Sequence, residues 1–192
     1  MISMVIDAQE KRDVATADVV GAYLNADMPD FVVLKLVSSA VDIMCTVNVK
    51  YKKFVSYENG KNVFYLQLLK PLYGCVQSAL LWYDLFTNTL KADGFELNLY
   101  DASVANKIVN GKQCNIVWYV DDKKISHVES NVMTGVVKMI EKRFGKMTVT
   151  RSKHYLFLGM SVTYKDDGTV DITMKDHIKM RSQSLMMISR HP

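Results

Sequence analysis

The sequence predicts an α+β protein, with a mixed or antiparallel sheet and helices packed on one face of it. β-prone residues flank the turn dipeptides Asn59-Gly60 and Asn110-Gly111, which is typical of β-hairpins. Residues 77–91 and 129–144 repeat apolar side chains at helical spacing. No internal repeat or Pro/Gly/Ser-rich linker separates these elements, so one domain is expected.

The first part of the chain alternates short helices and strands. Residues 3–11 are predicted to form a helix, because Ser3 can cap its N-terminus and an apolar side follows. A strand at residues 14–20 comes next, and then a short helix that Pro29 ends. Residues 31–36 read as a second strand because they are rich in Val, Leu and Phe.

The middle of the chain predicts one helix, a hairpin and a second helix. Ser38 can cap a helix that runs to about residue 53. Residues 54–57 and 63–66 are the strands of the first hairpin, and Pro71 follows the second of them. The helix at residues 77–91 closes at Asp93-Gly94.

The last part is predicted to hold a second hairpin, a helix and further strands. Its elements are strands at residues 103–109, 112–119 and 123–126, a helix at 129–144, strands at 155–164 and 169–174, and a helical stretch from 175.

Composition indicates a folded protein with no obligatory partner class. The chain has 192 residues, of which 49% are hydrophobic and 23% are charged, values of an ordinary globular domain. The net charge of +4 permits a polyanionic partner without requiring one.

Cysteine usage and the N-terminus indicate an intracellular protein. Cys45, Cys75 and Cys114 are odd in number and widely spaced, which predicts free thiols in a reducing compartment. No apolar run is long enough for a membrane span, so no membrane contact is expected. Asp7 and Glu10 lie where a secretion signal would be basic and then apolar.

Two adjacent carboxylates stand out. Asp121 and Asp122 follow the apolar run that ends in Trp118-Tyr119-Val120, and a second β-prone run comes after them, which predicts a hairpin with acids at its tip. Neighbouring carboxylates repel each other, and Mg²⁺ or Mn²⁺ would resolve that repulsion. A polar turn is the alternative, since Asp is a common turn residue.

A two-metal site needs a third carboxylate. Asp18 is the best candidate, because it lies in an apolar strand, where a carboxylate is costly unless it is paired or metal-bound. An edge strand with Asp18 facing solvent is the alternative.

Four motifs resemble, in type, order and spacing, those of reverse transcriptases. They are Asp18-Val19-Val20-Gly21-Ala22-Tyr23, Lys70-Pro71-Leu72-Tyr73-Gly74 with Gln77-Ser78, Tyr119-Val120-Asp121-Asp122, and Phe157-Leu158-Gly159-Met160. The second and fourth, with Trp82-Tyr83, are similar to those of copia-type (Pseudoviridae-like) LTR retrotransposons, and further stretches resemble algal and diatom elements. The resemblance covers about residues 4–178.

The resemblance implies an RNA-directed DNA polymerase with a palm-like fold, partial fingers and no thumb. Asp18, Asp121 and Asp122 are then the catalytic and metal-binding residues, with two Mg²⁺ (or Mn²⁺) ions expected. Asp18 is expected to bridge both ions, Asp121 to bind directly, and Asp122 to support the site.

Further roles follow from the same resemblance. The substrate-binding residues are expected to be Val19 and Val20 through their backbone, Tyr23 as a steric gate against the ribose 2′-hydroxyl, and Tyr73, Gly74 and Gln77. Leu158, Gly159 and Met160 resemble the primer grip. Either Lys146 or Lys153 could protonate the leaving pyrophosphate, and spacing does not choose between them. An ordinary core aromatic remains the alternative for Tyr23, and an ordinary core hairpin for the primer grip.

The chain departs from the copia-type pattern at several positions. Val76, Ala79 and Leu80 stand where the family usually carries Lys, Pro and Arg, which should weaken phosphate contacts. Lys123 directly follows the acids and is expected to pair with them and compete with metal.

The domain prediction is a partial reverse transcriptase at residues 1–178, a palm with a stub of fingers, and a C-terminal tail with a frayed helix at 179–192. Expected partners are an RNA/DNA primer-template, a dNTP and the remainder of a Pol polyprotein, in cytoplasmic virus-like particles or in the nucleus. An inactive remnant that keeps the fold and binds nucleic acid or a partner is the alternative. A palm-type nucleotidyl cyclase fits less well, because its hairpin would carry Gly-Gly before the acids.

Overall fold

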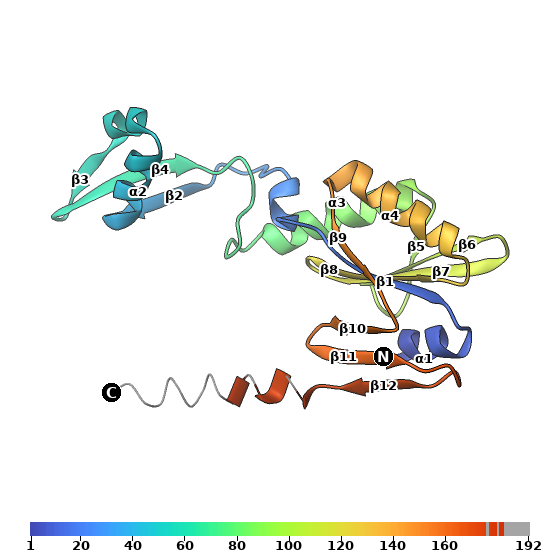
Figure 1. Cartoon of the computed structure of the whole chain (residues 1–192). Helices are drawn as coiled ribbons and strands as arrows, with labels where there is room; N and C mark the ends of the chain where they lie inside the picture. Colours follow the sequence, from blue (N-terminus) through green and yellow to red (C-terminus); the bar gives the residue numbers. More distant parts are fainter. Residues whose placement is uncertain (176, 180, 183–192) are drawn as a thin grey trace. The chain divides into compact units, whose positions relative to one another are not determined.

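The computed structural model describes residues 1–175, 177–179 and 181–182. The chain forms two compact units, one made of Met1–Ala22 and Tyr83–Pro192 and the other of Tyr23–Trp82. Both units are drawn in Figure 1. The first unit holds the three predicted carboxylates, and the second holds most of the predicted substrate-binding residues.

A six-stranded sheet is the centre of the first unit. Every pairing in it is antiparallel, which confirms the antiparallel form of the prediction. Its strands, in spatial order, are β5 (Glu96–Leu97), β6 (Val104–Val109), β7 (Lys112–Tyr119), β8 (Asp122–His127), β1 (Asp13–Asp18) and β9 (Thr148–Arg151).

Two helices cover one face of this sheet, α3 (Ser78–Ala92) and α4 (Ser130–Phe144). The ring of Phe86 lies 5.3 Å from that of Trp118 on the sheet and 5.9 Å from that of Phe144 on α4. Figure 1 shows both helices on the same side of the strands. The two amphipathic patterns in the sequence therefore mark this layer correctly.

The other face of the sheet carries α1 (Ile2–Gln9) and a three-stranded antiparallel sheet of β10 (His154–Phe157), β11 (Met160–Tyr164) and β12 (Val170–Thr173). A buried apolar cluster joins these elements to β1; its members are Met4, Val14, Tyr155, Phe157 and Val162. Removing this apolar area from water stabilises the contact. The large sheet is thus covered on both faces.

The second unit has its own small sheet, in the order β2 (Val33–Val37), β4 (Lys61–Gln67) and β3 (Ser56–Glu58). A short 3₁₀ helix at Ala22–Asn25 precedes it, and α2 (Ser39–Val47) and a second 3₁₀ helix (Val49–Phe54) lie between β2 and β3. The ring of Phe64 is buried, 5.8 Å from the ring of Tyr51 and 6.2 Å from that of Phe54.

The single helix predicted at residues 38–53 is wrong. The α-helix ends at Val47, because Asn48 is extended, with φ −148° and ψ 109°. The Asn48 carboxamide accepts a hydrogen bond of 3.0 Å from the Lys50 N–H, and a 3₁₀ helix follows. An Asn side chain that binds nearby backbone groups competes with helical hydrogen bonds in this way.

The single strand that the residue pattern predicted at 155–164 is also wrong. The segment is a hairpin, as the resemblance to the primer grip implied, with Leu158 and Gly159 in the turn at φ +51° and +75°. The two Asn-Gly hairpins are confirmed, and both residues of each turn likewise have positive φ. The sequence missed β5 and β9, which are short and partly exposed.

The remaining predictions concern the cysteines and the ends. Cys45, Cys75 and Cys114 are free thiols. In the described part of the chain, no helix is long and apolar enough to cross a membrane. Lys175, residues 177–179 and residues 181–182 are helical, whereas most of the predicted tail lies outside the described residues.

Candidate active site

The strand register brings the three predicted carboxylates to one end of the large sheet. Asp18, the last residue of β1, lies directly opposite Asp122, the first residue of β8. Side chains that are directly opposite in an antiparallel pair lie on the same face. Asp121 occupies the two-residue loop between β7 and β8, and its carbonyl accepts a hydrogen bond of 3.2 Å from the Val19 N–H.

The loop that carries Asp121 has an unusual backbone. Val120 has φ +50°, a conformation that β-branched residues rarely adopt. Such strain persists only where the surroundings hold it in place, and it concentrates at functional sites. The flanking pair, Tyr119 opposite Asp122, provides that restraint.

Negative charge is concentrated at this tip. The pKa of the Asp122 carboxyl is raised, first by partial burial and then by the charges of Asp18 and Asp121, while Lys123 opposes the shift. Carboxylate oxygens are the ligands that Mg²⁺ and Mn²⁺ prefer, so a divalent cation fits this donor set. As the side chains stand, no group of three or more His, Cys, Asp or Glu residues is arranged to hold a metal in the described ranges.

The Lys123 side chain lies on the opposite face of β8 from Asp122. It is opposite Ala17, on the face covered by α3 and α4, whereas Asp18 and Asp122 share the other face. Its ammonium lies 5.0 Å from the ring centre of Phe86 and donates to the carbonyls of Val120 at 3.0 Å and Asp121 at 2.7 Å. Lys123 thus supports the strained loop through its carbonyls, and its charge also interacts with those of Asp121, Asp18 and Asp122.

Burial lowers the pKa of Lys123 to about 8, and the charges of Asp121, Asp18 and Asp122 oppose this shift. The ammonium form donates more strongly to the loop carbonyls, because a charged donor strengthens a hydrogen bond.

A buried polar network, which sequence reasoning missed, connects this strand to the opposite layer. Lys124 of β8 is fully buried and forms an ion pair with Asp7 of α1. The Tyr164 hydroxyl donates to Asp7 Oδ2 at 3.2 Å, and the hydroxyls of Tyr164 and Tyr155 are 2.9 Å apart. Its signal in the sequence was weak: Asp7 lies in an apolar stretch, Lys124 follows three other charged residues, and nothing indicates that the two meet.

The predicted primer-grip residues lie on the same side of the sheet as the acids. The hairpin β10–β11 carries Leu158 and Gly159 in its turn, and Met160 begins β11. Met160 packs against the buried cluster on this face, together with Val117 of β7. Leu158 is 40% exposed, so the turn itself reaches the surface.

Replacing Gly159 by alanine is expected to destabilise this hairpin by about 1–2 kcal/mol, because an L-residue is strained at positive φ. The new Cβ would also lie 2.9 Å from Nδ1 of His177. Urea unfolding followed by circular dichroism measures the change. Gly111→Ala is the control, with φ +71° and no atom within 4 Å of its Cβ. Equal effects of the two substitutions would show that the His177 contact costs nothing.

The predicted nucleotide contacts divide between the two units. Val19 is buried, and its N–H is engaged with Asp121, while Val20 is 71% exposed. Tyr23 and Tyr73 belong to the second unit, and their ring centres are 4.4 Å apart. Gly74 has φ +98°, a conformation that favours glycine.

Gln77 and the positions that depart from the family pattern lie in the same unit. The Gln77 amide donates to Asp30 Oδ2 at 2.6 Å. Val76 and Leu80 are 98% and 61% exposed, so the residues that replace the expected cations lie on the surface.

The two lysines that spacing could not separate lie beyond opposite ends of β9. Thr148 of β9 is opposite Asp18, and Arg151 is opposite Ala15. Lys146 therefore comes just before the end of the strand that adjoins the carboxylates. Lys153 follows the other end and is paired with Asp166.

The chain is similar in sequence to known proteins. The family described as "Reverse transcriptase (RNA-dependent DNA polymerase)" matches residues 2–189. A putative transposon Ty5-1 protein of Saccharomyces cerevisiae is 27% identical over 135 residues, which cover 67% of this chain and 42% of the yeast protein.

Two solved structures of apo telomerase from Candida tropicalis are also similar. The first has a TM-score of 0.46 and 10% sequence identity; the match covers 90% of this chain and 35% of the telomerase chain. The second, described as truncated from the C-terminal domain, has a TM-score of 0.47 and 11% sequence identity. The match covers 90% of this chain and 38% of that telomerase chain. The chain thus spans less than half the length of these relatives.

The family match extends over nearly the whole sequence, and the transposon protein points to the same group. The chain therefore belongs to the reverse transcriptase (RNA-dependent DNA polymerase) family, in its copia-type branch.

Proposed function

We propose that this chain is the palm-centred catalytic part of an RNA-directed DNA polymerase, which adds a deoxynucleotide to a primer 3′-hydroxyl and releases pyrophosphate. The observation that carries the proposal is the register of β1 and β8. This register sets Asp18 opposite Asp122 on one face of the sheet, and the Val19 N–H donates a hydrogen bond to the Asp121 carbonyl in the adjoining loop. Family membership supports the same reaction.

Asp18 and Asp121 would hold two Mg²⁺ (or Mn²⁺) ions, with Asp122 supporting the site. The bound ions would lower the pKa of the primer hydroxyl and neutralise the triphosphate. Shared-face carboxylates suit this role because their mutual repulsion falls when a cation is bound. The pKa of Asp122 is raised first by partial burial and then by the charges of Asp18 and Asp121.

The chain's other residues would position the substrates. The exposed Val20 offers backbone groups to the triphosphate, Tyr23 acts as the gate against a 2′-hydroxyl, and Tyr73, Gly74 and Gln77 contact the nucleotide and template. Leu158, Gly159 and Met160 would hold the primer end, since their hairpin packs on the carboxylate face.

Lys146 is the better candidate for protonating the pyrophosphate. It adjoins the end of β9 that lies beside Asp18, whereas Lys153 is at the far end and ion-paired. Lys146→Ala should therefore slow extension more than Lys153→Ala.

The alternative function is nucleic-acid or partner binding without catalysis. The exposed apolar residues Val76 and Leu80, at positions where the family usually has cations, favour it. Loss of such cations weakens phosphate contacts.

Primer extension on poly(rA)/oligo(dT) with Mg²⁺ or Mn²⁺ tests the proposal. We expect wild type to extend the primer and to bind Mn²⁺ more tightly than Asp121→Asn, and Asp84→Asn, an exposed acid on α3, to behave as wild type. Absence of extension together with equal Mn²⁺ binding by all three proteins would contradict the catalytic function. Primer-template binding that survives Asp121→Asn under those conditions would support the alternative.

The proposed partners are primer-template, dNTP and the remainder of a Pol polyprotein. The proposed location is intracellular, in cytoplasmic virus-like particles or in the nucleus.

A further inference from the structure

The loop that carries Asp121 is held from inside the protein by one lysine. Lys123 is fully buried, and its ammonium donates to the carbonyls of both loop residues, Val120 and Asp121. The same ammonium lies over the ring of Phe86 on α3. A buried ammonium is costly unless hydrogen bonds and an aromatic face replace its water. The two carbonyls and the ring replace that water here, so the lysine and the loop stabilise each other.

The loop needs such support because the sheet does not position it. Asp18 and Asp122 are paired across the β1–β8 ladder. Val120 and Asp121 instead lie in the loop between β7 and β8, outside the ladder. Val120 has φ +50°, and the first position of a two-residue hairpin loop with positive φ usually carries glycine. Of the three carboxylates, Asp121 is thus the one whose position depends on contacts made by the loop.

The Asp121 carbonyl connects this support to the strand that carries Asp18. It accepts from the Lys123 ammonium at 2.7 Å and from the Val19 N–H at 3.2 Å. A carbonyl oxygen has two lone pairs, so it can accept from both donors. Val19 directly follows Asp18 in the chain. One oxygen atom therefore joins the lysine, the loop and the end of β1, and it fixes where Asp121 lies relative to Asp18.

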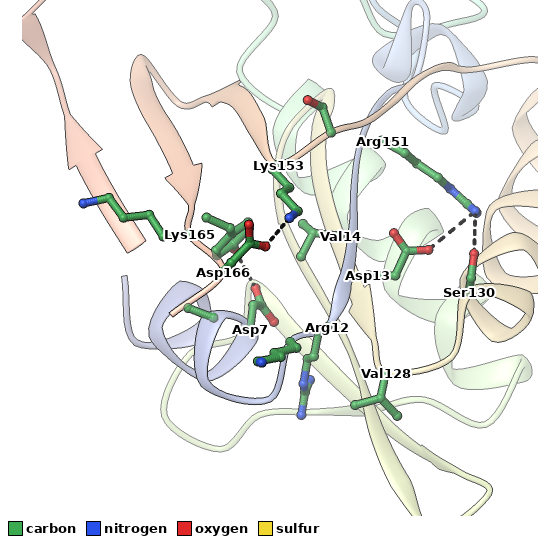
Figure 2. Close-up of a pocket in the computed structure, with 14 residues that line it drawn as sticks. Asp7, Arg12, Asp13, Val14, Val128, Ser130, Arg151, Lys153, Lys165 and Asp166 are labelled. Atoms are coloured by element: carbon green, nitrogen blue, oxygen red, sulfur yellow. Dashed lines mark hydrogen bonds and ion pairs between the residues drawn. The ribbon is translucent and has the colours of Figure 1, made fainter. Parts of the chain in front are cut away.

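The other end of β1 is fixed independently. The Arg151 guanidinium lies 3.6 Å from the Asp13 carboxylate, at the first residue of β1, and donates to Ser130 Oγ at 3.4 Å. Figure 2 shows these contacts. Pairing with β8 on one side and β9 on the other holds the rest of the strand. A change in the separation of Asp18 and Asp121 must therefore come from the loop.

We propose that Lys123 is a positioning residue, which sets the place of Asp121 relative to Asp18 and so prepares the carboxylate tip to bind metal. This inference rests on the proposed function, because it takes the two carboxylates as ligands of shared ions. Lys123 acts through the loop backbone, from the face of the sheet that α3 and α4 cover, whereas Asp18 and Asp122 share the other face.

The sign of the effect on metal affinity separates positioning from competition. The charge of Lys123 interacts with the charges of the three carboxylates. If that were its whole effect, removing the lysine would tighten Mn²⁺ binding, because a cation that opposes Mn²⁺ is lost. A positioning lysine has the opposite effect. Without it, Asp121 spends less time in the place that binds metal, and the apparent affinity falls with that fraction.

Lys123→Met tests the proposal, because methionine has an unbranched side chain without a donor or a charge. We expect the Val19 amide hydrogen, followed by NMR in EDTA, to exchange about tenfold faster than in wild type, while amides in the middle of β1 keep their rates. Mn²⁺ affinity, followed by electron paramagnetic resonance, should fall about fivefold. Lys107→Met should change neither value. It removes a lysine that also lies over an aromatic ring, 5.5 Å from the centre of Phe95, but on β6.

Val120→Gly supplies a second test. Glycine adopts positive φ without strain, so the loop should need less support from the lysine. In the Val120→Gly background, Lys123→Met should therefore change Val19 exchange and Mn²⁺ affinity by less than about twofold. A lysine that served only the packing of the core would have the same effect in both backgrounds. If Lys123→Met does not fold, Lys123→Gln, which is neutral but keeps a donor, replaces it in both comparisons, with the same direction of change expected.

Unchanged Val19 exchange in a folded Lys123 variant would overturn the proposal. Tighter Mn²⁺ binding, or an effect of equal size in the Val120→Gly background, would also overturn it. None of these measurements requires catalysis. Equal Mn²⁺ binding by wild type and Asp121→Asn would contradict the proposed function, whereas Val19 exchange in EDTA would still show whether Lys123 holds the loop.

Discussion

Replacing Lys124 by methionine is expected to lower the free energy of unfolding by about 3–5 kcal/mol, because it leaves the Asp7 carboxylate buried without its counter-charge. Both side chains are almost completely inaccessible, at 0% and 1% exposure, so water cannot compensate. Urea unfolding of wild type and variant, followed by circular dichroism, measures the difference. Lys138→Met, at an exposed position of α4, should change stability by less than about 0.5 kcal/mol.

The double variant Asp7→Leu/Lys124→Met separates the ion pair from the packing. Apolar side chains of similar volume often replace a buried ion pair without loss of stability. The double variant should therefore regain most of the stability that Lys124→Met loses. If the double variant loses as much free energy of unfolding as the two single variants together, the two side chains act independently and do not stabilise each other.

The largest effect on activity is expected from Asp18→Asn. If Asp18 and Asp121 share the bound ions, the substitution removes a metal ligand on which stabilisation of the transition state depends. A loss of several kcal/mol of this stabilisation corresponds to an extension rate that is about 10³-fold lower or more. Single-turnover extension with saturating dNTP measures it. The fold should be kept, because Asp18 is half-buried and lies at the end of its strand.

A double-variant cycle tests whether the acids form one site. The effects of substituting residues that act as a unit are not additive. The extension rate of Asp18→Asn/Asp121→Asn should therefore be little lower than that of either single variant. Fully additive losses in rate and in Mn²⁺ affinity would show that the two carboxylates act separately. Asp84→Asn again provides the control for loss of one negative charge.

Local chemistry in the sequence was sufficient for the hairpins and the two main helices. Asn59-Gly60 and Asn110-Gly111 both adopt positive φ, which few other residue pairs do readily, so the turn could be predicted without knowing the rest of the fold. The apolar spacing of residues 129–144 predicted α4 within one residue, because its buried side chains repeat along one face.

Other elements depended on information that no short window contains. Asn48 ends α2 through its own carboxamide, an outcome that competes closely with helix continuation. The β10–β11 turn uses Leu158 before Gly159, a pair without the usual Asn or Asp signal. Strand β9 consists mainly of exposed residues and forms because its backbone pairs with β1 at the edge of the sheet.

The sequence by itself determined the family, because motif order and spacing are properties of the chain, and the same motifs predict the three carboxylates of the site. Only the tertiary structure decided which residues meet. Antiparallel register sets Asp18 against Asp122, and the alternation of side chains along β8 sends Lys123 toward the helices and Lys124 toward Asp7. A shift of one residue in that register would exchange the two faces, and nothing within a single strand specifies which partner it pairs with.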